Sequence, residues 1–121
     1  MHQESLSVIK VREILIVTVP SDPDDSTIAQ LQEKVLARLE HHQAKGVVLD
    51  VSAVETLDSF FARTVTETAQ MIGVMGGRTI IVGMRPAVAI TTTQIGLALG
   101  SIETALTVDL ALDRVTHGLT Q

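Results

Sequence analysis

The sequence predicts an α/β fold: a mixed central β-sheet of about five strands with about four α-helices packed against it. Two features predict it. After an initial pair of strand-like segments, β-branched runs alternate with segments of helical periodicity, and residues 46–51 are apolar almost throughout. Of the 121 residues 45% are hydrophobic, but only two are Phe and none is Trp or Tyr, so the core must be aliphatic. This length fits a single domain spanning residues 1–121.

The first elements are strands. Residues 6–11 and 14–19 are rich in β-branched side chains and are separated by Arg12 and Glu13. This pattern predicts either a strand pair or one bent strand. Pro20 is expected to end the second segment.

A helix follows the acidic turn at residues 21–27. Asp and Ser side chains of this turn can accept hydrogen bonds from the first N–H groups of the helix, and Thr27 and Gln30 have the spacing of a capping box. Gly46 is expected to stop the helix. Five apolar residues are spaced to form one helical face: Ile28, Leu31, Val35, Leu36 and Leu39.

Residues 46–51 predict a strand buried on both faces, at the centre of the sheet. A second helix is expected to start near Asp58 and to end by Gly76 and Gly77. Its predicted inward residues are Phe61, Val65, Ala69 and Ile72.

The last third of the chain predicts four more elements and a tail that frays. In order they are a strand at 78–83, a helix at 87–99 with Pro86 in its first turn and Gly100 closing it, a short strand at 102–108, and a helix at 109–115 with Asp109 as N-cap; the tail is 117–121.

Composition argues against several classes of protein. The net charge of −5 and the scarcity of aromatic residues disfavour nucleic-acid binding. The absence of cysteine removes disulfides and thiolate chemistry and fits a reducing compartment. The N-terminus has no signal-peptide pattern, and no apolar stretch approaches the roughly 20 residues that span a bilayer. We therefore expect a cytoplasmic protein that does not insert into a membrane.

No residue pattern predicts a catalytic, cofactor or metal site. The four histidines, at positions 2, 41, 42 and 117, lack zinc-site spacing. Gly76 and Gly77 follow a helix and precede a strand, the reverse of the order in phosphate-binding loops. Asp50 is a candidate acid at a strand end, but a lone carboxylate more often anchors a loop. We therefore expect that the protein is not an enzyme and binds no cofactor.

Residues 56–63 are the most informative segment, because they follow the predicted central strand and open a helix. Asp58 and Ser59 have the pattern of helix-capping residues, which is the simpler interpretation. The alternative is that the exposed Ser59 hydroxyl accepts a phosphate, which would add close to two negative charges beside Asp58. Thr56 is a secondary acceptor candidate or a plain turn residue, and Arg63 either pairs with the phosphate or is simply solvated.

The sequence resembles the STAS domains, a family with the SpoIIAA-like fold. Within that family it resembles the single-domain stressosome scaffold subunits of the RsbS type. The resemblance covers nearly the whole chain. It is carried by residues 46–51 leading to 57–60, then by residues 78–89, 94–99 and 102–106. The family's hallmark is a phosphorylatable Ser or Thr that directly follows an Asp at the start of a helix. Asp58 and Ser59 match this pattern.

The resemblance implies that Ser59 is phosphorylated by a serine kinase that the scaffold sequesters, and that a cognate phosphatase resets it. It also implies assembly with paralogous STAS sensor subunits into a homo- or hetero-oligomer. Asp58 would shape the site, and Phe60 and Arg63 would contact the partner. Many anti-sigma factor antagonists of the family have a second hydroxyl and a Gly after the acceptor. Phe60 and Phe61 stand there instead, so the resemblance favours the scaffold over sigma-factor antagonism.

Two further alternatives remain. Some STAS domains are similar in fold but sense a nucleotide or a lipid, although this chain lacks a phosphate-binding loop and basic clusters. A hydrolase could use Asp50, Asp58 and Ser59, but no His or Lys stands near the serine to act as its base.

Overall fold

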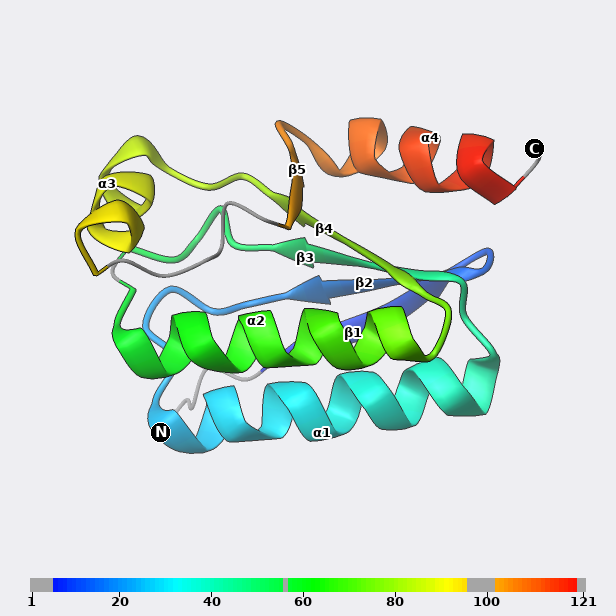
Figure 1. Cartoon of the computed structure of the whole chain (residues 1–121), viewed down its shortest axis with the longest axis horizontal. Coiled ribbons are helices and arrows are strands. Elements are labelled where there is room, and N and C mark those ends of the chain that lie inside the picture. The colour runs from blue at the N-terminus through cyan, green and yellow to red at the C-terminus, as the bar shows by residue number, and fades with distance from the viewer. Residues whose placement is uncertain (1–5, 56, 96–101, 120–121) are drawn as a thin grey trace.

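The computed structural model describes residues 6–55, 57–95 and 102–119 (Figure 1). The elements in chain order are β1 (Ser7–Val11), β2 (Ile14–Thr18), α1 (Asp25–His42), β3 (Gly46–Asp50), α2 (Ser59–Val74), β4 (Arg78–Val82), α3 (Pro86–Ile95), β5 (Glu103–Ala105) and α4 (Val108–Leu119). The strands form one sheet in the order β1-β2-β3-β4-β5. β1 pairs with β2 antiparallel, and the other neighbours are parallel. The predicted mixed sheet with four helices is confirmed.

β1 and β2 form a hairpin, so the alternative of a single bent strand is wrong. Val11 pairs with Ile14, and Arg12 and Glu13 make the turn. Arg12 adopts a positive φ of 58°, a left-handed conformation that two-residue hairpin turns require.

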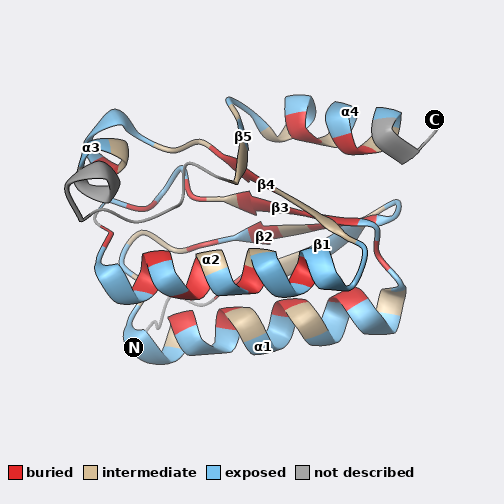
Figure 2. Ribbon diagram, viewed as in Figure 1, coloured by how far each residue is buried: buried red, intermediate tan, exposed pale blue. Residues whose placement is uncertain are grey.

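The sheet is the middle of three layers (Figure 1). α1 and α2 cover one face and α4 covers the other, and the helices turn their buried residues toward the sheet (Figure 2). β3 is the central strand, as predicted. Its Val47 and Leu49 belong to the larger core under α1 and α2, and Val48 belongs to the smaller core under α4.

An aspartate of the acidic turn caps the first helix, as expected, but the capping box and the predicted stop of this helix are wrong. Asp24 is the N-cap, because its Oδ1 accepts a hydrogen bond from the Thr27 backbone N–H at 2.7 Å. Thr27 therefore lies inside the helix, and the predicted capping box with Gln30 is wrong. Gln43, at a φ of 49°, ends the helix, and Gly46 begins β3 instead of stopping α1.

The last third of the chain also differs from the prediction in detail. Asp109 is not the N-cap of α4, since the Leu110 N–H donates to Thr107 Oγ1 at 3.2 Å and the helix starts at Val108. α4 includes residues 117–119 of the tail that was expected to fray. β5 has three residues where residues 102–108 were expected. The predicted end of the third helix at Leu99 and Gly100 lies outside the described residues.

A bidentate ion pair ties β5 to β4. Arg78 Nε and Nη2 donate to Glu103 Oε1 and Oε2 at 2.6 and 2.7 Å. These bonds lower the pKa of the Glu103 carboxyl and raise the pKa of the Arg78 guanidinium. The pair therefore joins the short edge strand to the sheet only while Glu103 is ionised.

Because the pKa of Glu103 is lower in the folded chain, the pair stabilises the fold above the unfolded pKa and loses this effect as pH falls through the folded pKa. Both side chains are more than a third exposed, so we expect at most about 1 kcal/mol. Urea unfolding of the wild type and Glu103→Gln at neutral pH and near pH 3 checks this. The wild type should be the more stable protein only at neutral pH. The same stability difference at both pH values would contradict the assignment.

Candidate functional site

The candidate site lies at the carboxyl edge of the parallel strands, where the segment between β3 and α2 crosses the end of the sheet. The Val51 N–H donates to the Val82 carbonyl at 3.0 Å. The Ser52 N–H donates to Asp50 Oδ1 at 2.9 Å. Asp50 thus anchors a loop, which was the favoured interpretation of its sequence position. Further along, the Glu55 N–H donates to the Ser21 carbonyl at 3.3 Å, which links the segment to the loop after β2.

Two residues after β4 hold the same segment from its other side. Gly83 has a φ of 76°, and a Cβ built on it would lie 2.6 Å from the Ser52 Cβ. No other residue fits there without displacing the loop. Arg85 Nε donates to the Ser52 carbonyl at 3.0 Å. Neither residue was predicted to belong to the site; the glycine directly after a predicted strand was the available signal.

The start of α2 is fixed by the capping aspartate and by one large apolar side chain. Asp58 is extended, with φ −102° and ψ 175°, and its Oδ1 accepts a hydrogen bond from the Phe61 N–H at 2.8 Å. Phe61 is 2% exposed and belongs to the main core. Ser59 is the first helical residue and is exposed. Its side chain therefore stands in solvent on a backbone that is anchored on both sides.

The structure places the other predicted site residues around Ser59 as follows. Phe60 is 39% exposed, next to the buried Phe61. Arg63 is exposed one turn further along α2, and within the described part of the chain it makes no ion pair. Thr56 lies outside the described residues.

Besides Arg63, several acidic residues lie around the start of α2. Asp22 and Asp58 line a shallow pocket of about 130 Å³ together with Ile28, Leu57 and Phe61. Exposed Asp24 and Asp25 stand at the adjacent start of α1. Figure 1 shows the N-terminal ends of α1 and α2 on the same side of the molecule, with α3 beside them. A phosphate on Ser59 would add negative charge to this rim, and the positive end of the α2 dipole would offset part of it.

Two histidines, His41 and His42, stand apart from Ser59. They lie in the last turn of α1, at the end of that helix remote from Asp24. Among residues 6–55, 57–95 and 102–119 no group of His, Asp and Glu is arranged to hold a metal ion. In the same residues no helix combines the length and the apolar character needed to cross a bilayer. The Ser59 hydroxyl lies at the opposite end of the helical layer, exposed at the start of α2.

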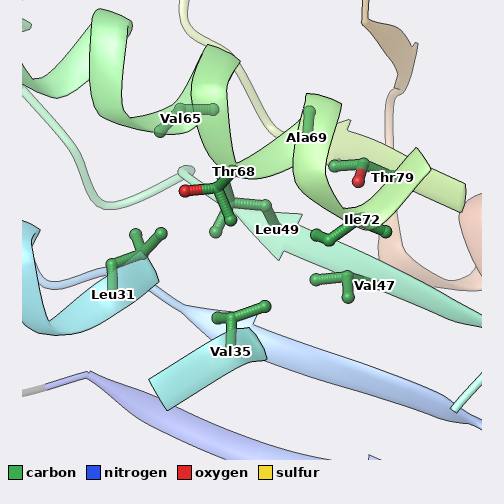
Figure 3. A pocket seen from close by; sticks show the side chains of 9 residues that line it. All are labelled: Leu31, Val35, Val47, Leu49, Val65, Thr68, Ala69, Ile72 and Thr79. Carbon is green, nitrogen blue, oxygen red and sulfur yellow. The ribbon is translucent and has the colours of Figure 1, made fainter. Parts of the chain in front are cut away.

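The interior between the helical layer and the sheet holds a small cavity (Figure 3). Its volume is about 10 Å³, and α1, α2, β3 and β4 line it with Leu31, Val35, Val47, Leu49, Val65, Thr68, Ala69, Ile72 and Thr79. That volume is at the lower limit for one water molecule. The cavity has no room for a nucleotide, so it lends no support to the ligand-sensing alternative.

Comparison with known proteins identifies the fold and its relatives. Residues 5–111 match the model of the STAS domain. The RsbT co-antagonist protein RsbRA of Bacillus subtilis (strain 168) is 22% identical over 105 residues. That alignment covers 86% of this chain but 38% of RsbRA, so the chain spans little more than a third of that relative.

Solved structures match over nearly the whole chain. A serine-to-glutamate variant of RsbS from Moorella thermoacetica is 30% identical, with a TM-score of 0.86 and coverage of 98% of this chain and 100% of that one. A chain from a structure on the molecular architecture of the stressosome is 30% identical, with a TM-score of 0.80 and coverage of 95% and 100%. Unphosphorylated SpoIIAA, an anti-sigma factor antagonist, shares the fold at 18% identity, with a TM-score of 0.72 and coverage of 93% and 98%.

Proposed function

The chain belongs to the STAS domain family, and from this we propose that it is a non-enzymatic scaffold subunit of a bacterial stress-signalling complex. In this role it sequesters a serine kinase and releases it when Ser59 is phosphorylated. The family and its SpoIIAA-like fold were predicted from the sequence and are confirmed. The 30% identity to RsbS over almost the full length of both chains supports the scaffold over other STAS roles.

One observation carries the proposal: Ser59 is exposed at the start of α2, on a backbone fixed by Asp58 and Phe61. A kinase needs to reach the hydroxyl without unfolding the segment around it. Asp58 accepts a hydrogen bond from the Phe61 N–H, and the N–H groups of Ser59 and Phe60, which have no partner within the helix, are available to a phosphate there. Addition of phosphate is therefore compatible with the fold.

Phosphorylation of Ser59 is a phosphoryl transfer, and its energetic effect is on the interface between this chain and the kinase. The Ser59 Oγ forms a bond to the γ-phosphorus of ATP, the bond to ADP breaks, and the hydroxyl proton leaves with the kinase base. A cognate phosphatase hydrolyses the ester and resets the site. The docked kinase covers the acidic rim, with contacts to Phe60 and Arg63, and Asp58 shapes the acceptor. A doubly charged phosphate under that contact opposes binding.

The same proposal places the protein in the cytoplasm, in an oligomer with paralogous STAS sensor subunits, and without nucleic-acid or membrane partners. RsbRA, described as an RsbT co-antagonist, has a region similar to this chain, which supports association between such STAS chains. Thr56 stays a secondary acceptor candidate.

Phosphate uptake from ATP in the presence of the cognate kinase tests the acceptor. We expect Ser59→Ala to lose essentially all uptake. Ser26→Ala is the matched control, because Ser26 is also an exposed serine that follows an aspartate in the first turn of a helix. It should retain wild-type uptake. If Ser59→Ala is phosphorylated to the wild-type level, the assignment is wrong; uptake that moves to Thr56 would make that residue the acceptor.

A further inference from the structure

The outer edge of β1 is open. Among the described residues β1 pairs with β2, and no strand lies on its other side. The Val19 N–H donates to a carbonyl of β3 at 3.1 Å, so the peptide groups of Val19 face β3. Successive residues of a strand face opposite neighbours, so Ile16 faces β1, and its partner Ile9 faces back toward β2. The peptide groups of Val8 and Lys10 therefore point outward, where another strand can reach them.

The side chains of β1 give this edge one charged side and one apolar side. Val8 packs against the larger core, so it lies on the face of the sheet that α1 and α2 cover. Lys10, two residues further on, lies on the same face and is exposed. Ile9 lies on the opposite face and is 53% exposed. A strand added here would meet a positive charge on one side and an apolar side chain on the other.

The flank of α1 toward this edge is basic. Gln32 Nε2 donates to Thr68 Oγ1 of α2 at 3.3 Å, so the flank of α1 that carries Gln32 faces α2. Helical spacing puts Lys34, Arg38 and His41 on the opposite flank, and all three are exposed. Because α1 contacts β2 while α2 contacts β4, that opposite flank faces the β1 side of the sheet.

The charges of the helix and of the strand lie close enough to act on one another. His42 ends α1, and its ring centroid lies 4.8 Å from that of His41. Burial lowers the pKa of this histidine, and the positive charges of His41, Lys10 and Arg38 lower it further. We call these four residues, together with Lys34, the basic strip.

The acidic residues nearby do not neutralise the basic strip. Glu33 and Glu40 are the acids in this half of α1, and helical spacing puts both outside the basic flank. Glu13 stands in the hairpin turn. Within the described part of the chain the ion pairs all involve Glu103, at the other edge of the sheet. The strip is therefore a positive surface on a chain whose net charge is −5, and its electrostatic complement is an acidic ligand.

We propose that β1 accepts an extended, acidic segment of another protein as a sixth strand of the sheet. The backbone of that segment pairs with Val8 and Lys10. The carboxylates of its alternate residues face the basic strip, and the apolar side chains between them contact Ile9. Strand addition draws its affinity from backbone hydrogen bonds and its specificity from alternate side chains. Lysine on an edge strand discourages indiscriminate pairing, and here the strip repels basic strands while it attracts acidic ones.

The acidic stretch of this chain is not suited to that role, so the partner is a different chain. Asp22, Asp24 and Asp25 are interrupted by Pro23, which has no N–H to donate to a strand. Asp24 is also held as the N-cap of α1. The contact is additional to the one proposed at Ser59, because the strip lies along the second half of α1 and Ser59 lies at the end of the molecule where α1 begins (Figure 1).

Fluorescence anisotropy with a labelled peptide of about eight residues that alternates glutamate and valine tests the contact. Arg38→Glu should weaken binding at least about 10-fold, because it replaces a cation of the strip with an acid. Lys45→Glu is the matched control, because Lys45 is also exposed but stands directly before β3, two strands away from the open edge. It should bind like the wild type. Equal binding by Arg38→Glu and wild type overturns the proposal.

Hydrogen exchange separates strand pairing from attraction between charges alone. The peptide should slow exchange of the Val8 and Lys10 amides and should hardly change that of Ile9, which already faces β2. N-methylation of one alternating set of the peptide's nitrogens should abolish binding, and N-methylation of the other set should not. A wild type that does not bind the peptide, or that binds it with both outward amides unprotected, overturns the proposal.

Vesicles of phosphatidylcholine and phosphatidylserine test whether a membrane is the partner instead. The wild type should not sediment with them. Sedimentation that Arg38→Glu abolishes would assign the strip to a lipid surface and overturn the proposal. The melting temperature of Arg38→Glu should stay within a few degrees of the wild type, since this side chain is exposed. The variant should accept phosphate at Ser59 like the wild type, so failure of this contact and failure of the phosphorylation switch are distinguishable.

Discussion

Ser59→Asp is expected to weaken binding of the cognate kinase by roughly 100-fold, the equivalent of somewhat under 3 kcal/mol. The new carboxylate would stand beside Asp58 in a rim that already carries Asp22 and Asp24. Docking would remove it from water, and Arg63 one turn along α2 would offset its charge only in part, so burial of the carboxylate is costly. Titration calorimetry or surface-immobilised binding with the purified kinase measures the change.

The same variant should hardly change the stability of the fold. Ser59 is exposed, and an acidic residue in the first turn of a helix interacts favourably with the helix dipole. Ser59→Asn is the matched control, because asparagine has the size of aspartate without its charge. It should bind the kinase far better than Ser59→Asp. Equal loss in both variants would mean that bulk, and not charge, disrupts the interface.

Phe61→Ala is expected to lower the free energy of unfolding by about 3–5 kcal/mol. The side chain is 2% exposed, and it is among the largest fully buried side chains of the described structure. Its removal leaves a cavity beneath the first turn of α2, next to Ile28 and Leu57. Urea unfolding followed by circular dichroism measures the loss. Because this residue anchors the segment that presents Ser59, phosphate uptake should also become slower as the segment loosens.

Phe60→Ala is the control within the same turn. Phe60 is 39% exposed, so its truncation should cost about 1 kcal/mol or less, the usual range for exposed positions. Phosphate uptake should survive, while affinity for the kinase should fall if Phe60 contacts it. Equal destabilisation by the two alanine variants would contradict the division of roles between adjacent phenylalanines.

Sequence periodicity predicted the elements well because it reflects local geometry. The apolar residues Leu31, Val35 and Leu39 recur at helical spacing and are buried, and the run from Val47 to Leu49 is buried on both faces of the sheet. Helix ends were less predictable. Several side chains at each terminus compete for the free backbone groups. Asp24 therefore caps α1 without the expected capping box of Thr27 and Gln30, and Thr107 caps α4 where Asp109 was expected.

The inward face of α2 was also only partly predicted. Phe61, Val65 and Ile72 are buried as expected, but Thr64 and Thr68 are buried too. Because threonine is polar, the spacing of apolar residues along the helix predicts that it is exposed. Here Thr68 Oγ1 donates to the Thr64 carbonyl at 2.7 Å, which satisfies the hydroxyl inside the helix and allows its burial.

By itself the sequence determined the family, the alternation of strands and helices, and the position of Ser59 at the start of a helix, because each depends on residues that are close in the chain. Only the tertiary structure brought Ser21, Ser52, Gly83 and Arg85 to one edge of the sheet. These contacts join residues up to dozens of positions apart. They follow from the strand order and the packing of the layers, which local patterns do not encode.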